Sequence, residues 1–183
     1  FQHQTRGASA ATASQSGISG GGDASVAMAW EDEDRVLQYQ SLFEKAGAKY
    51  DLPPAVLAAI ASRETRGGNV LGSDGYSSAD GQGFGLMQVD KRFHDISGGP
   101  RSGEHIEQAA SILRSMLDKI VASHPDWSAS EQLRGSLAAY NSGAGSVRSV
   151  GGMDRGTTGG DYSGDTWIRA QYYARFFRDQ SLS

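Results

Sequence analysis

The chain has 183 residues, of which 38% are hydrophobic, and this is enough for one domain of ordinary size with a buried core. Its 21 acidic and 17 basic residues give a net charge of −4, which argues against a nucleic-acid partner, since such proteins usually carry a basic excess. The absence of cysteine excludes disulfides, thiolate metal sites and a cysteine nucleophile. The longest apolar run, at 55–61, is too short to span a bilayer, so we expect no membrane insertion.

The first 29 residues are rich in glycine, alanine and serine and show no apolar period. We therefore expect an extended or poorly ordered arm at 1–29, followed by a single domain at 30–183. Apolar residues at steps of three and four predict an amphipathic helix from about 32 to about 50. Asp51 is a candidate cap for the next helix, and the two prolines that follow it suit a helical first turn.

The helix predicted at roughly 53–66 carries a glutamate on its apolar stripe. Glu64 lies four residues after Ile60, so it continues the buried face of the helix. Partial desolvation and the negative end of the helix dipole favour the protonated form of a carboxyl group, which is the condition for a general acid. The structural alternative is an ion pair with Arg63 or Arg66 at the helix end.

The segment GQGFGLMQVDK, at 81–91, brings three glycines into an apolar run and ends beside an aspartate. It suits a glycine-assisted turn into a short buried strand, with Asp90 as a solvated stop, and equally a backbone that lies against a ligand and delivers Asp90 to it. Asp80 precedes this segment. One acid on a helix and one or two on a facing loop is the arrangement that glycoside hydrolysis requires. We expect a small loop or hairpin region around 70–95.

The second half of the chain again predicts helices. A long one is expected at about 103–123, a capping box from Ser128 to Glu131 begins another, and the last runs from about 164 to 178. The fold class is therefore mainly α, with helices around a groove and the small hairpin region beside them.

The sequence offers little support for catalytic chemistry other than glycoside hydrolysis. Serine-triad and zinc motifs are missing, and among the histidines only His94 has a position suited to a site, whereas His105 is expected to be exposed on its helix. Tyr140 and Asn141 end a helix before flexible glycines. They suit either a helix stop or the recognition of a sugar.

These pieces together resemble the goose-type lysozymes. The chain carries SRETRGG, GFGLMQVDKR, AYNSGAGSVRS and MDRGTTGGDY in the order and approximate spacing of that family. GLMQ and AYN alone also occur in lytic transglycosylases, but their combination with VDKR and GTT is specific.

The resemblance implies an α+β lysozyme-like superfold and hydrolysis of the β-1,4 bond between N-acetylmuramic acid and N-acetylglucosamine in bacterial peptidoglycan, with no cofactor and no metal. Glu64 matches the general acid and Asp90 the acid that positions or activates water, so we expect inversion at the anomeric carbon. Asp80 aligns approximately with a further loop aspartate. The substrate-binding residues that the resemblance implies are Gln88, His94, Tyr140, Asn141 and Tyr162.

Two alternatives stay open: a lytic transglycosylase that yields 1,6-anhydro products, and a lysozyme-like protein that binds the cell wall without cleaving it. We expect a bacteriolytic monomer that is secreted, although no signal peptide opens the chain and an intracellular or lysosomal site stays open. Arg63, Arg66, Lys91 and Arg92 flank the candidate acids, so we expect a locally positive groove. Activity should be highest on the acidic side of neutral and at low ionic strength.

Overall fold

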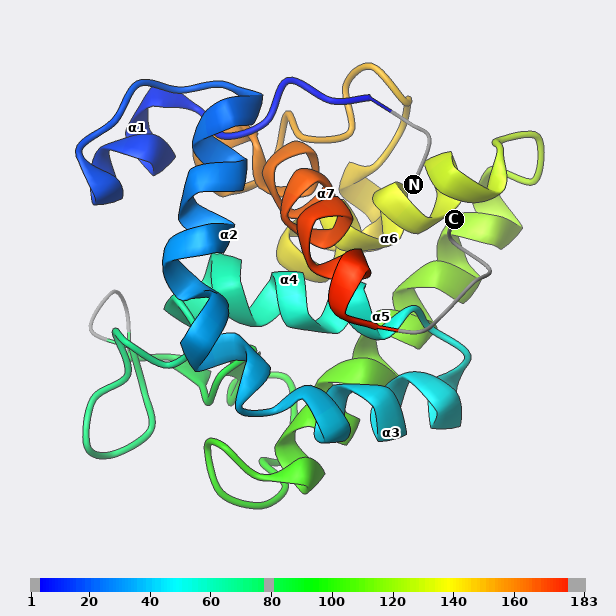
Figure 1. Ribbon diagram of the computed structural model, residues 1–183. Coiled ribbons are helices and arrows are strands. Elements are labelled where there is room, and N and C mark those ends of the chain that lie inside the picture. Colours follow the sequence, from blue (N-terminus) through cyan, green and yellow to red (C-terminus); the bar gives the residue numbers. More distant parts are fainter. Residues whose placement is uncertain (1–3, 78–80, 178–183) are drawn as a thin grey trace.

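The structure is a computed structural model that describes residues 4–77 and 81–177, and Figure 1 shows how its elements are arranged. Its helices are α1 (Ala10–Ala13), α2 (Gly22–Leu37), α3 (Gln40–Tyr50), α4 (Pro54–Thr65), α5 (Gly103–Ser123), α6 (Ala129–Ser142) and α7 (Tyr162–Tyr173). Short 3-10 helices lie at Ser14–Ser16, Ala144–Ser146, Thr158–Gly160 and Ala174–Phe176. Strands β1 (Gly83–Phe84) and β2 (Val89–Asp90) form an antiparallel hairpin. The prediction of a mainly α fold with a small hairpin is confirmed.

Helix α4 lies at the centre of the core. Residues 55–62 are all buried, so this helix is apolar around its whole circumference, as expected of a helix surrounded by others. It packs against α2, α3 and α7 (Figure 1). Full burial of one large side chain from these helices, such as Trp167 of α7, stabilises the fold by about 1.5–3 kcal/mol. The last turn of α4, which carries Glu64, therefore projects from a rigid platform.

The expectation of an extended or poorly ordered N-terminal arm is wrong for the residues that the structure describes. Helix α1, a 3-10 turn and the start of α2 occupy this region, and α2 runs without a break across the expected boundary at residue 29. Long-range hydrogen bonds hold it in place. The Thr5 hydroxyl donates to the Gly164 carbonyl oxygen (2.6 Å), and the Ser9 amide donates to the Asp161 carboxylate (2.7 Å). The N-terminal segment is thus tied to the beginning of α7.

The single helix predicted for 32–50 is two helices, because the chain departs from helical geometry at Tyr39, which precedes α3 with φ −104°. The predicted capping role of Asp51 is also wrong. Asp51 instead ends α3 in a left-handed conformation (φ 52°), and Pro53 precedes the first turn of α4.

The helices predicted in the second half agree closely with the structure. Helix α5 has the predicted bounds, and both bonds of the capping box are present: the Ser128 amide donates to Glu131 Oε1 (2.8 Å), and the Glu131 amide donates to Ser128 Oγ (3.1 Å). The last helix begins two residues earlier than predicted, at Tyr162, and continues after Tyr173 as a 3-10 turn.

The turn between the two strands packs tightly on α5. Gly85 has a φ of +79°, and a Cβ atom there would lie 2.4 Å from Cε1 of His105, so only glycine fits. The Met87 amide donates to Nε2 of His105 (3.0 Å). His105 is fully buried under this turn, and the expectation that it is exposed is wrong. Within the described ranges, no helix has the length and apolarity needed to cross a bilayer.

Candidate active site

Glu64 occupies the last turn of α4, where the helix leaves the core, and its side chain is partly exposed. Its closest electrostatic neighbours include two tyrosines from other helices. Burial raises the pKa values of Tyr140, at the end of α6, and Tyr162, at the start of α7, and the negative charge of Glu64 raises both further. Glu64 therefore lies near two tyrosines that stay neutral.

Both tyrosines are fixed by neighbouring groups. The Tyr140 hydroxyl donates to the Met87 carbonyl oxygen in the hairpin turn (2.6 Å). The Tyr162 ring lies under the Arg63 guanidinium, whose central carbon is 5.1 Å from the ring centroid. The surroundings of Glu64 are thus built jointly by α4, α6, α7 and the hairpin.

Asp90, the last residue of β2, is held by a residue two positions further along the chain. Its Oδ1 accepts from the Arg92 amide (2.9 Å) and from Arg92 Nε (3.0 Å), and its Oδ2 accepts from Arg92 Nη2 (2.7 Å). These bonds hold the pKa of Asp90 below its usual range. Asp90 is therefore an ionised carboxylate in a fixed orientation, with about a third of its side chain still exposed.

A groove of about 520 Å³ runs between the hairpin side and helices α5 and α6. Five of the predicted site residues line it: Gln88, Asp90, His94, Tyr140 and Asn141. Tyr140 belongs both to this lining and to the surroundings of Glu64, whereas Glu64 and Tyr162 are not themselves among the residues that line this groove. The predictions from widely separated motifs thus converge on one region of the surface.

Two amide side chains of the groove also make internal bonds. Asn141 pairs reciprocally with Thr158, accepting from its amide (2.8 Å) and donating to its hydroxyl (3.3 Å). Gln88 has a left-handed backbone (φ 56°) and donates from its side chain to the Gly85 carbonyl oxygen (3.0 Å). Both amides are therefore oriented before any ligand binds, which reduces the entropy lost on binding.

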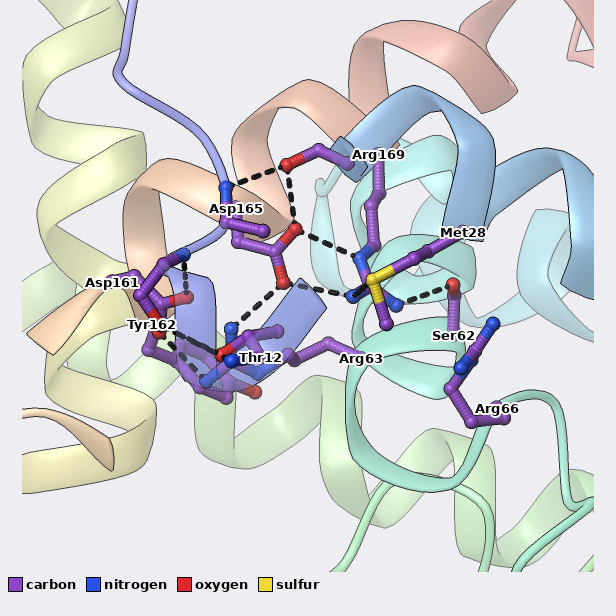
Figure 2. A network of polar contacts seen from close by, with 12 residues as sticks. Thr12, Met28, Ser62, Arg63, Arg66, Asp161, Tyr162, Asp165 and Arg169 are labelled. Atoms are coloured by element: carbon purple, nitrogen blue, oxygen red, sulfur yellow. Dashed lines mark hydrogen bonds and ion pairs between the residues drawn. The ribbon is translucent and has the colours of Figure 1, made fainter. Parts of the chain in front are cut away.

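The arginines next to Glu64 belong to a buried ion network that is shown in Figure 2. Arg63 pairs with Asp161 (2.9 Å) and Asp165 (2.7 Å). Arg66 pairs with Asp32 (2.9 Å) and with Glu31. The carboxylates that pair with these two arginines lie in other elements and become visible only in the fold.

The expectation of a locally positive groove is not met by these residues. The buried carboxylates compensate the charges of Arg63 and Arg66, and Asp90 compensates that of Arg92. Lys91 is directed to the Tyr76 ring, 4.9 Å from its centroid.

Asp80 lies outside the described residues. Within residues 4–77 and 81–177, no three histidine, aspartate or glutamate side chains form a group that could hold a metal ion. Three apolar residues of the groove were not predicted to belong to a site: Phe93, Ile112 and Met116. A signal was available for Phe93, because an aromatic residue between Arg92 and His94 is unusual for a polar loop.

The helical fold, with Asp90 in its groove and Glu64 at the end of α4, fits the class of glycoside hydrolases with a lysozyme-like fold. The family described as lysozyme g matches residues 1–176. Lysozyme G of Dromaius novaehollandiae is 44% identical over 170 residues, which cover 92% of this chain and 82% of that protein. Lysozyme g of Gallus gallus is 44% identical over 170 residues (92% and 80%), and that of Epinephelus coioides is 43% identical over 180 residues (93% and 92%).

The chain therefore belongs to the lysozyme g family. It is a peptidoglycan-cleaving glycoside hydrolase, and the resemblance read from the sequence motifs is confirmed.

Proposed function

We propose that the chain hydrolyses the β-1,4 bond between N-acetylmuramic acid and N-acetylglucosamine with inversion, using Glu64 as general acid and Asp90 as the residue that positions water. The observation that carries this proposal is that one side chain, Tyr140, links the groove that contains Asp90 to the surroundings of Glu64, which is not itself among the residues that line the groove. Tyr140 lines the groove beside Asp90 and lies within the electrostatic reach of Glu64. An acid on each side of a scissile bond is the arrangement of an inverting glycosidase.

Glu64 has the surroundings that a proton donor needs. It projects from the C-terminal turn of a buried helix, where the dipole disfavours a negative charge. The neutral hydroxyl of Tyr162 lies within the electrostatic reach of its carboxyl group, and Arg63 is held by Asp161 and Asp165. Its proton goes to the glycosidic oxygen as the bond to the anomeric carbon breaks.

Asp90 suits the orientation of water better than strong basic catalysis. Because Arg92 lowers its pKa, the carboxylate is a weak base that stays ionised in mildly acidic solution. Each of its oxygens has further lone pairs beyond the bonds from Arg92 and can accept a hydrogen bond from water. The water attacks the anomeric carbon from the face opposite the leaving group, and Asp90 receives its proton as the positive charge on the sugar collapses.

The other groove residues would bind the glycan. We assign the hydroxyl and acetamido groups of the sugars to five residues: Gln88, His94, Tyr140, Asn141 and Tyr162. Asp80 keeps the role of a second water-positioning acid as a proposal. We further propose that the protein is a monomer and acts outside the cell, at a pH on the acidic side of neutral.

The chemical form of the product tests the reaction. Purified peptidoglycan is digested and the masses of the muropeptides are measured by mass spectrometry. Proton NMR identifies which anomer forms first at the new reducing end. We expect fully hydrated products that appear first as the α anomer. Products lighter by one water molecule would instead identify a transglycosylase, and a β anomer at early times would overturn inversion.

A further inference from the structure

Phe93 is unusually exposed for a large apolar side chain. About 75% of it is accessible, compared with 67% for Trp30, another exposed aromatic residue in the described part of the chain. Single exposed apolar residues are normal on protein surfaces. Phe93 differs from Trp30 in its place, because it lines the groove that contains Asp90.

The position of Phe93 relative to Asp90 is fixed by the backbone and by Arg92. The amides of Phe93 and His94 both donate to the Asp90 carbonyl oxygen (3.2 and 3.1 Å), which closes a turn after β2. The Arg92 guanidinium, clamped by the Asp90 carboxylate, lies 5.5 Å from the centroid of the Phe93 ring. The ring is therefore supported by the same cation that orients the candidate water-positioning acid.

The groove around Phe93 is divided into apolar and polar parts. Ile112 and Met116 of α5 share its lining with Phe93, whereas Gln88 and Asn141 offer amide groups. Pyranose rings in a β-1,4 chain have the same division, with C–H groups on the ring faces and hydroxyl and acetamido groups around the edge. An aromatic ring recovers hydrophobic free energy when it covers such a face.

We propose that Phe93 is a specificity-determining residue that stacks on a sugar ring of the glycan chain, next to the ring that contacts Asp90. The apolar side chains of Ile112 and Met116 receive the acetamido methyl group of that sugar. This inference rests on the proposed function, since it takes the glycan to lie along the groove. Phe93 contributes to binding and leaves the chemical step to Glu64 and Asp90.

Binding can be measured separately from cleavage. In a Glu64→Gln background, calorimetry with soluble glycan-strand fragments of alternating N-acetylglucosamine and N-acetylmuramic acid should give a Kd about tenfold higher for Phe93→Ala, or about 1.4 kcal/mol. Phe93→Trp should bind within about twofold of the parent, and Trp30→Ala, the matched exposed aromatic control, should leave Kd unchanged. In the active enzyme, Phe93→Ala should raise KM by a similar factor with little change in kcat.

Three results would overturn the inference: an unchanged Kd for Phe93→Ala, an equal loss for Trp30→Ala, or full rescue by Phe93→Leu, which would indicate apolar bulk without stacking. A failure of the proposed function looks different. In that case the protein with Phe93 intact would release anhydro products, or Glu64→Gln would keep its activity, whatever the Phe93 variants do to Kd.

Discussion

Asp165→Asn tests the stability of the buried ion network most sharply. The Asp165 side chain is fully buried, and its carboxylate accepts from Arg63 Nη1 (2.7 Å), from Arg169 Nε (3.0 Å) and Nη2 (2.9 Å), and from Ser25 Oγ (2.7 Å). The change keeps the size of the side chain but removes one negative charge between two guanidinium groups. It also turns one acceptor oxygen into an amide that donates toward those groups.

The magnitude follows from burial. Arg169 is fully buried, and its other carboxylate, Asp32, lies at 3.7 Å. Removal of one partner from a buried ion pair costs about 3–5 kcal/mol, because the remaining charge is left desolvated. For a chain of this size, 1 kcal/mol shifts Tm by about 2–4 °C, so we expect a decrease of roughly 10 °C.

Urea and thermal unfolding followed by circular dichroism measure this effect. The matched control is Asp118→Asn, which removes the same charge from the exposed pair with Arg114 (2.9 Å, 61% of the Asp118 side chain accessible). That pair should contribute less than about 0.5 kcal/mol. A loss below about 1 kcal/mol for Asp165→Asn, or one no larger than that of the control, would refute the reasoning.

Three further predictions concern the hairpin and its support. Arg92→Ala removes the guanidinium bonds and charge that lower the pKa of Asp90 but keeps the bond from the backbone amide, so this pKa should rise and the acid limb of the pH–activity profile should move to higher pH. An unchanged acid limb would show that Asp90 does not cause it. Gly85→Ala should lower the free energy of unfolding, measured with urea, by about 2–4 kcal/mol, because its Cβ would meet the His105 ring. Gly81→Ala, also at positive φ but in open space, should lower it by about 1 kcal/mol. Equal losses for the two variants would contradict the tight packing of Gly85 on His105. Burial lowers the pKa of His105 to about 4 from an ordinary 6.5, so between these two values the unfolded chain binds one more proton than the folded chain. The free energy of unfolding should therefore fall by roughly 3 kcal/mol as the pH drops from 6.5 to 4. NMR should show a neutral His105 ring at about pH 5.5, and a charged ring there would overturn the prediction.

Local patterns in the sequence identified much of this architecture. Periodicity located the buried helix α4 that carries Glu64, because helical periodicity depends only on neighbours along the chain, but the burial extends around the whole helix and not along one stripe. The capping box at Ser128 was found for the same reason, and the bounds of α5 followed from its long apolar face. In GQGFGLMQVDK the glycines predicted a turn and the apolar residues predicted a short strand. The structure has both features in one hairpin, with a tight glycine turn and a strand that ends at Asp90.

What the sequence did not predict depends on contacts between distant segments. The N-terminal segment looked unstructured because its order comes from bonds of Thr5 and Ser9 to residues more than 150 positions away. The partners of Arg63, in α7, were equally invisible, so Glu64 seemed a possible partner for it. His105 was misjudged because the turn that covers it belongs to another element.

The central claim of this account is that Glu64 donates the proton to the leaving sugar. The most direct measurement is the rate of peptidoglycan hydrolysis by Glu64→Gln, which keeps the size and the hydrogen-bonding capacity of the side chain but removes its acidic proton. We predict a loss of about 10²–10⁴-fold in kcat, with the binding of glycan fragments and the Tm nearly unchanged. A Glu64→Gln variant that is folded and keeps more than about a tenth of the wild-type kcat would contradict the account.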